Sequence, residues 1–200
     1  MHDSREHILK IAFILFLHKS FKSVTIRDIV EKTGLSKGAF YHYFSSKEEL
    51  FTEIIRTYYF SMMAVPFDQF NQKSFCGFYH DYINHVVSEF MQLKEILNDT
   101  DDEDDINYFT LAFDAMNLFP GFKEQIEEHH VLELAAWTEA VKRGKKSGEI
   151  KSVMTDDQMA RLFVYASGGL GLHLIMEGRI RQLKQEMLQV WDGFYLQIKA

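Results

Sequence analysis

Proline is scarce in this chain, and that scarcity is the strongest single constraint on its fold. Only two prolines, Pro66 and Pro120, occur in 200 residues. Proline interrupts a helix because it lacks a backbone N–H and clashes with the preceding turn. Apolar residues recur with helical spacing, and no segment alternates apolar and polar residues for long enough to predict a strand. The sequence therefore predicts an all-α protein of about nine helices.

Capping residues mark the first four predicted helices. The side chain of Ser, Thr or Asp can cap a helix start, and an acidic residue three positions later can return the bond. Ser36 is expected to open the third helix, and Gly34 to end the second in a left-handed conformation. Three pairs have the capping-box spacing: Asp3 with Glu6, Thr25 with Asp28, and Ser46 with Glu49. These four helices are predicted over residues 4–19, 26–33, 37–44 and 46–63.

Longer helices are predicted in the rest of the chain. Thr155 with Gln158 forms a further capping box, and Gly178 separates the last two helices. The acidic run NDTDDEDD at 98–105 lacks the Gly and Glu positions of an EF-hand and is expected to be a solvated loop. His and Cys show no metal-ligand spacing, so neither a metal nor a cofactor is expected. The later helices are predicted over residues 71–97, 103–118, 122–146, 155–177 and 180–199.

Composition places the chain among globular proteins, with 46% hydrophobic and 26% charged residues. A single cysteine, Cys76, excludes an internal disulfide and is typical of a reducing compartment. The start MHDSREHILK lacks the apolar region of a secretory signal peptide, so a cytoplasmic protein is expected. The net charge of −7, taken as an average, argues against nucleic acid as a partner.

Residues 162–176, LFVYASGGLGLHLIM, form the most apolar stretch of the chain. A membrane-spanning helix needs about 20 apolar residues, whereas this stretch spans 15 residues and includes His173. A helix that is apolar nearly all round but too short for a bilayer is a buried helix. We therefore expect no membrane association, and we expect this helix to be buried against a partner subunit.

Residues 25–44, TIRDIVEKTGLSKGAFYHYF, have the order helix, glycine-containing turn, helix. This order is the helix-turn-helix pattern of many DNA-binding proteins. The second helix starts with Lys37, Gly38 and Ala39, and the two small residues allow its N-terminal end to approach base edges or phosphates closely. Phe40 and Phe44 are expected to point into the protein.

Residues 8–50 resemble the DNA-binding domain of the TetR (tetracycline-repressor-like) family of bacterial regulators. The departures are Ser20 where the family usually has Gly, Val30 where it usually has Ala, and Phe13 where a second Ala is common. They concern turns and packing. The matching positions keep one register over 43 residues: Ile8, Leu9, Ala12, Leu15, Phe16, Phe21, Thr25, Ile29, Thr33 to Gly38, Tyr41, Tyr43, Phe44, Ser46, Lys47, Glu48 and Leu50.

The resemblance implies a helix-turn-helix DNA-binding domain over residues 1–47 that binds a double-stranded operator. Packing is the alternative role for Tyr41 and Tyr43, and a solvated charge is the alternative for Lys47. The resemblance implies that His42 faces the DNA groove. The residues that fall on DNA-contacting positions of the family are Thr25, Arg27, Lys37, Gly38, Ala39, Tyr41, His42, Tyr43 and Lys47.

For residues 48–200 the resemblance implies a domain that binds a small ligand and forms a homodimer through the last two helices. An aromatic excess between residues 51 and 122, 16 of 29 aromatic residues, favours an apolar or aromatic ligand. Ordinary core packing is the alternative for each ring. The ligand candidates are Tyr59, Met62, Met63, Phe67, Phe78, Tyr82, His85, Phe109, Phe113, Met116 and Trp137. The interface candidates are Phe163, Ser167, Gly168, Leu170, Gly171, Leu174, Leu183, Met187, Val190, Trp191 and Phe194.

Other functions are weighed against this one. An enzyme lacks support, because no nucleophile motif, phosphate loop or metal set is present. A regulator of the same fold that senses no small molecule, and a scaffold that has lost DNA binding, remain open. The charge distribution favours a regulator: residues 1–47 hold eight Lys/Arg and four Asp/Glu, a formal charge of +4, which leaves −11 for residues 48–200.

Overall fold

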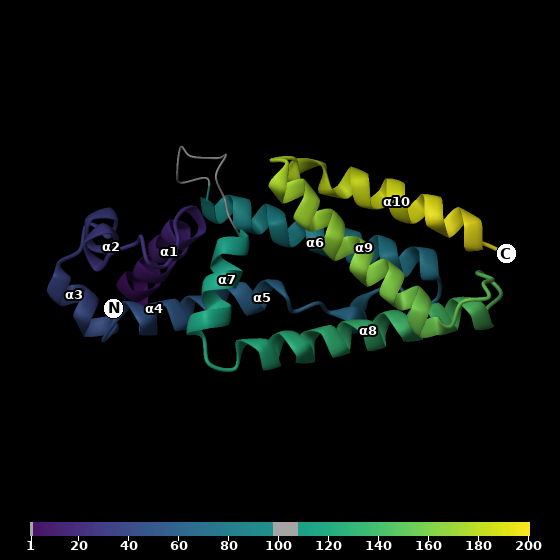
Figure 1. Ribbon diagram of the computed structural model, residues 1–200, viewed down its shortest axis with the longest axis horizontal. Coiled ribbons are helices and arrows are strands. Elements are labelled where there is room, and N and C mark those ends of the chain that lie inside the picture. The colour runs from purple at the N-terminus through teal and green to yellow at the C-terminus, as the bar shows by residue number, and fades with distance from the viewer. Residues whose placement is uncertain (1, 98–107) are drawn as a thin grey trace. The chain divides into compact units, whose positions relative to one another are not determined.

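The computed structural model describes residues 2–97 and 108–200, and these residues are almost entirely helical (Figure 1). Among them, strand-like pairing is limited to an isolated antiparallel bridge between Ile150 and Lys199. The prediction of an all-α fold is therefore confirmed. The acidic run at 98–105 and the predicted helix start at 103 lie outside the described residues.

The chain forms two compact units. The first comprises the described residues of 1–64 and 93–125, and the second comprises residues 65–92 and 126–200. The boundary predicted at residue 47 thus falls inside the first unit, which joins the helix-turn-helix to a helix from later in the chain. The helical elements of the first unit are α1 (His2–His18), α2 (Ile26–Thr33), α3 (Lys37–Tyr43), α4 (Lys47–Ile54), the π-helical turn η1 (Ile55–Tyr59), α5 (Phe60–Met62) and α7 (Tyr108–Leu118).

Three of the predicted helix ends in the first unit are correct. Thr25 and Asp28 form the reciprocal capping box of α2. Gly34 ends α2 with a φ of 68°, a left-handed conformation that glycine adopts without steric cost. The Ser36 hydroxyl accepts a hydrogen bond from Ala39 N at 3.1 Å and so caps α3.

Two capping predictions are wrong. Asp3 lies inside α1, which already begins at His2, so Asp3 is not its N-cap. Ser46 caps α4 by accepting from Glu49 N at 3.0 Å, but the Glu49 carboxylate does not complete the box. It accepts instead from the backbone N–H and the hydroxyl of Ser45, one residue earlier. Half of the predicted box therefore forms.

The apolar face predicted for the first helix packs into the core of the first unit. Ile8, Ala12 and Phe16 of α1 are buried. The Phe16 ring lies 5.7 Å from Phe21, which follows α1, and 5.1 Å from Phe51 of α4. These rings fix α1 and α4 around the connection between α1 and α2.

The second unit is built around a cluster of buried rings. Trp137 lies 5.2 Å from Phe163 and 5.2 Å from Trp191, and all three are buried. The predicted helix over 71–97 begins at residue 75, and the last helix begins at 183, after a 3-10 turn. The elements of the second unit are η2 (Phe67–Gln69), most of α6 (Phe75–Leu97) and α8 (Phe122–Lys146), and all of α9 (Asp156–Met176), η3 (Ile180–Gln182) and α10 (Leu183–Ile198).

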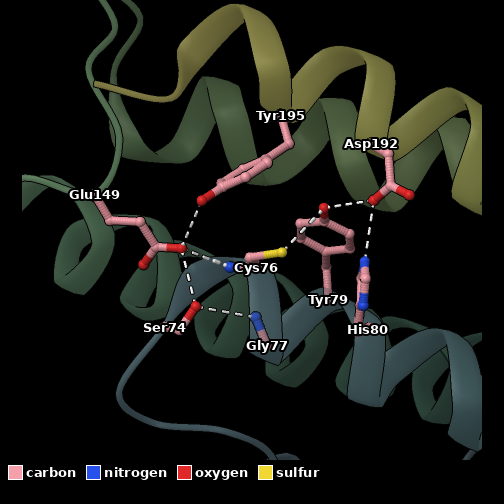
Figure 2. A network of polar contacts seen from close by, with 8 residues as sticks. All are labelled: Ser74, Cys76, Gly77, Tyr79, His80, Glu149, Asp192 and Tyr195. Carbon is pink, nitrogen blue, oxygen red and sulfur yellow. Dashed lines mark hydrogen bonds and ion pairs between the residues drawn. The ribbon is translucent and has the colours of Figure 1, made fainter.

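Within the second unit, a polar network joins the start of α6 to Glu149 and to α10 (Figure 2). The Glu149 carboxylate accepts from Phe75 N at 2.6 Å, from Cys76 N at 2.9 Å and from the Tyr195 hydroxyl at 3.1 Å. Burial alone would raise the pKa of Glu149, but the hydrogen bonds outweigh burial and lower it. Glu149 therefore acts as an ionised cap for the first turn of α6.

Helix α9 is, in the part of the chain that the structure describes, the one helix long and apolar enough to cross a membrane. Only 28% of its most apolar stretch is buried. Leu162, Tyr165, Leu172 and Met176 are exposed along it. A helix of a protein assembly passes the same test of length and composition, so α9 by itself does not indicate a membrane.

Candidate nucleic-acid interface

Helices α2 and α3 form the helix-turn-helix, and their sequence-encoded caps position them. The Asp28 carboxylate accepts from the backbone N–H and the hydroxyl of Thr25, at 2.7 Å each. These bonds lower the pKa of Asp28, so it caps α2 as an anion. On the inner side of α3, Phe40 and Phe44 are buried, with ring centroids 6.0 Å apart, as predicted.

The outer side of α3 is open to solvent. Lys37, Gly38 and His42 are exposed, and Tyr41 is 47% exposed. The Lys37 ammonium lies 5.9 Å from the centre of the Tyr41 ring, so the two side chains share one surface. Ala39 and Tyr43 are half-buried beside them. The exposed side of α3 thus presents the Lys37 ammonium and Gly38 in its first turn, the Tyr41 hydroxyl further along, and the His42 imidazole in its last turn.

Thr25 and Arg27 of the preceding helix are exposed as well. Six of the nine residues predicted to contact DNA are therefore exposed, and the other three, Ala39, Tyr43 and Lys47, are half-buried. Their contacts with DNA stay predictions.

Lys47 is the residue whose place differs from the prediction. Its ammonium donates to the carbonyl oxygens of Phe21 at 2.7 Å and of Val24 at 2.6 Å. It also lies 4.1 Å from the centre of the Phe21 ring. An ammonium has three N–H donors, and these carbonyls use two of them. The structure gives Lys47 a part in holding the connection between α1 and α2, and the predicted phosphate contact is left with one donor.

Asp114 is a residue that sequence reasoning missed. Its carboxylate, on α7, accepts a hydrogen bond from Phe21 N at 2.6 Å. The two residues are 93 positions apart in the sequence, so no local pattern signals their contact. Arg5 was also missed: it pairs with Glu53 at 2.8 Å and lies 5.2 Å over the Phe44 ring, and so joins α1 to α4 and to the end of α3.

The ligand candidates separate into two groups. In the second unit, Trp137 lies 5.1 Å from Phe78 and 5.2 Å from Tyr82, and Phe67 stacks 6.3 Å from Tyr82. His85 lies 5.9 Å from Phe70, which packs against Phe78. Among the described residues, Trp137 Nε1 and His85 Nε2 are buried without a hydrogen-bond partner. The remaining candidates lie in the first unit: Tyr59 is buried, Met62, Met63 and Phe109 are half-buried, and Phe113 and Met116 are exposed.

Tyr82 has a polar partner in this part of the second unit. Its hydroxyl donates to the Glu133 carboxylate at 2.8 Å. Burial raises the pKa of Glu133, which favours its neutral form, and burial together with Glu133 raises the pKa of Tyr82. The Tyr82 ring lies 5.2 Å from Trp137, whose Nε1 has no hydrogen-bond partner, so the Tyr82–Glu133 pair adjoins that ring.

The predicted dimer interface needs correction. Five candidates point into the core of their own chain and are not available to a partner subunit: Phe163, Leu174, Leu183, Met187 and Trp191. Gly168 and Val190 are exposed, and Ser167, Leu170, Gly171 and Phe194 are half-buried. The apolar pattern of these helices covers two faces, and periodicity alone does not say which face the chain itself buries. The exposed large apolar residues of α9 and α10 are Leu162, Tyr165, Leu172, Met176, Val190 and Leu196.

Comparison with known proteins places this geometry in context. Residues 8–54 match the family described as bacterial regulatory proteins, tetR family. An uncharacterized HTH-type transcriptional regulator of Bacillus subtilis, YfiR, is 27% identical over 173 residues, which cover 84% of this chain and 78% of YfiR. The HTH-type transcriptional repressor KstR2 of Mycolicibacterium smegmatis is 35% identical over 54 residues, 27% of this chain and 26% of that repressor.

Among solved structures, a putative transcriptional regulator of the TetR/AcrR family is similar over nearly the whole chain. It has a TM-score of 0.64 and 22% identity, and the match covers 95% of this chain and 97% of that one. This likeness shows the fold. The match to the family model is confined to residues 8–54, the part that contains the helix-turn-helix.

Proposed function

Because the chain belongs to the TetR family of DNA-binding transcriptional regulators, we propose that it is a repressor that binds a pseudo-palindromic operator as a homodimer and is released by a small apolar or aromatic ligand. Its relatives and its fold are those of regulators and not of enzymes. As a regulator of transcription it would work in the cytoplasm, where bacterial DNA lies.

The exposed N-terminal end of α3 carries the DNA-binding proposal. Lys37, Gly38 and Tyr41 lie together where a helix N-terminus attracts phosphates and a small residue permits close approach to base edges. The formal charge of +4 over residues 1–47 orients this end of the sequence toward DNA. The charge of −11 over the remaining residues disfavours binding of DNA elsewhere.

The exposed apolar side chains of α9 and α10 support the homodimer. Exposed apolar side chains that gather on one face indicate an interaction site. Two copies related by a two-fold axis would present two α3 helices to half-sites about one DNA turn apart. Gly168 and Gly169 are exposed on α9 and would allow close approach of a second helix.

The unpartnered polar atoms in the second unit support the ligand response. Buried polar groups in proteins nearly always have a hydrogen-bond partner. Trp137 Nε1 and His85 Nε2 lie among aromatic rings, and a ligand with an apolar body and a hydrogen-bonding group would satisfy them. Such a ligand lowers DNA affinity if it binds the DNA-incompetent state more tightly.

Fluorescence anisotropy with labelled duplexes from the region upstream of the gene tests the proposal. The wild-type protein should bind a discrete site at physiological salt, with a stoichiometry of two chains per site. Lys37→Ala should change the sequence preference, because a side chain at the start of α3 reads base edges. Lys123→Ala, in which an exposed lysine of α8 is removed, is the control. Binding at the non-specific level would refute the proposal.

A regulator that senses no small molecule is the alternative. A panel of aromatic and lipid-like compounds, added to the preformed protein–DNA complex, separates the two. Release by a member of the panel, with a matching rise in thermal stability of the free protein, supports ligand control. Binding of a discrete site that no compound alters supports control by a protein or by concentration.

A further inference from the structure

Phe21, in the connection between α1 and α2, is held by three other elements of the first unit. Its N–H donates to Asp114 of α7 at 2.6 Å, and its carbonyl accepts from Lys47 of α4 at 2.7 Å. Its ring packs 5.7 Å from Phe16 of α1 and 5.0 Å from Phe51 of α4. Both backbone groups and the side chain of one residue are therefore fixed from separate directions.

This connection leads directly into the helix-turn-helix. Lys47 also binds the carbonyl of Val24 at 2.6 Å, and the next residue, Thr25, caps α2. Only three residues separate Phe21 from Thr25. A displacement of Phe21 would therefore move the start of α2, and α3 with it, because the two helices pack together.

Helix α7 is anchored at its other end to the helical segment that continues α4. Phe119, which follows α7, lies 5.5 Å from Phe60, and Arg56 lies 5.5 Å over the Phe119 ring. Phe122 lies 5.5 Å from Phe60. Thus α7 contacts the rest of the first unit at two places: the entrance to α2, through Asp114, and the segment after the π-helical turn η1, through the rings that follow α7.

We propose that Asp114 is a positioning residue for DNA recognition: its hydrogen bond to Phe21 N–H holds the entrance of the helix-turn-helix, and α7 transmits displacement to α2 and α3 through it. The transmission of a ligand signal rests on the function proposed above, whereas the holding of α2 does not. Asp114 is the one acidic residue of α7, and its carboxylate accepts from Phe21 N.

Two substitutions separate the hydrogen bond from the charge. Asp114→Asn removes the negative charge and keeps an acceptor for Phe21 N–H. Asp114→Ala removes both and leaves a part-buried N–H without its partner. Loss of a negative charge by itself favours DNA binding, since DNA is an anion. If Asp114 positions α2, Asp114→Ala should nevertheless bind DNA more weakly.

The control is Asn117→Ala on the same helix. Asn117 is exposed, and its side chain donates to Phe113 O of α7 itself at 2.9 Å. It therefore tests for a general effect of substitution on α7 without touching the connection between α1 and α2.

The first measurement is amide hydrogen exchange in the free proteins. We expect Asp114→Ala to exchange about tenfold faster than wild type at Phe21 and in α2, with Asp114→Asn and Asn117→Ala within about threefold of wild type. The second is affinity for the upstream DNA, which should fall about tenfold for Asp114→Ala and stay equal or rise for Asp114→Asn.

Exchange in Asp114→Ala that equals wild type at Phe21 and α2 would overturn the proposal. So would equal DNA affinity of the alanine and asparagine variants. If Asp114→Ala does not fold, the asparagine variant decides: a tenfold loss of affinity despite the retained acceptor would contradict the role of the bond. Failure of the wild-type protein to bind DNA would refute the proposed function, and the exchange data would still decide the role of Asp114.

Discussion

The two compact units of this protein differ in the contacts that stabilise each of them internally. In the first, hydrogen bonds to backbone groups add to the packing of Phe16, Phe21 and Phe51: Lys47 donates to two carbonyls, Asp114 accepts from one N–H, and side chains cap α2, α3 and α4. In the second, long helices pack around buried rings, with Trp137, Phe163 and Trp191 at the centre. Hydrogen bonds have a narrow range of geometry, whereas apolar contacts tolerate small shifts.

This difference matches what the proposed function asks of each unit. Reading DNA requires α3 to be held to a fraction of an ångström, and directional bonds achieve this in helices too short to be stable by themselves. A body that binds a ligand must repack. Substitutions in the second unit should therefore cost mainly stability, and substitutions in the first should cost mainly DNA affinity.

The largest expected effect is that of Trp137→Ala. Removal of a fully buried tryptophan should lower the free energy of unfolding by about 3–5 kcal/mol, because it leaves a cavity among the rings. Chemical denaturation followed by circular dichroism measures this. Trp137→Phe keeps most of the ring and removes the unpartnered N–H, and it should cost less than about 1.5 kcal/mol. Equal losses for the two variants would contradict packing as the main contribution of Trp137.

Glu149 is an exception to the ring packing of the second unit, because its carboxylate fixes the start of α6 by hydrogen bonds to backbone N–H groups. Glu149→Gln should lower the free energy of unfolding by about 1–2 kcal/mol at pH 7, since its amide group would face backbone N–H donors (Figure 2). Glu139→Gln, an exposed residue of α8, is the control and should change it by less than about 0.5 kcal/mol.

The difference in stability between the wild-type protein and Glu149→Gln should depend on pH, in a direction set by the lowered pKa of Glu149. The pKa of Glu149 in the folded state lies below the ordinary value of 4.5, so its ionised form stabilises the fold above pH 4.5. This contribution is lost as the pH falls through the lowered native pKa. The wild-type protein and Glu149→Gln should therefore converge in stability below pH 4.5. A difference that stays constant from pH 7 to pH 3 would contradict the ionised cap.

Most of the helix-turn-helix could be predicted from sequence, because its signals are local. Thr25, Gly34 and Ser36 set the ends of α2 and α3 through bonds within four residues. The contacts of Asp114 and Lys47 with Phe21 could not be predicted, because they join residues distant in the sequence. Five residues predicted for the dimer interface are instead buried in their own chain for a related reason: α9 and α10 are apolar on more than one side. Which side faces Trp137 depends on the packing of the whole unit.

Substitution of Lys47 is expected to change stability least. It also tests most directly whether hydrogen bonds to backbone groups position the helices of the first unit. Lys47→Met keeps the aliphatic stem over the Phe21 ring but removes both bonds to backbone carbonyls, and it should cost about 1 kcal/mol of stability. We expect DNA affinity to fall about tenfold, with the slope of log affinity against log salt unchanged, because the ammonium holds the entrance of α2 instead of neutralising a phosphate. Lys22→Ala removes an exposed charge from the same connection and is the control. A slope that decreases by about one for Lys47→Met would show that Lys47 contacts a phosphate, as the family resemblance implies, and that its bonds to Phe21 and Val24 give way when DNA binds.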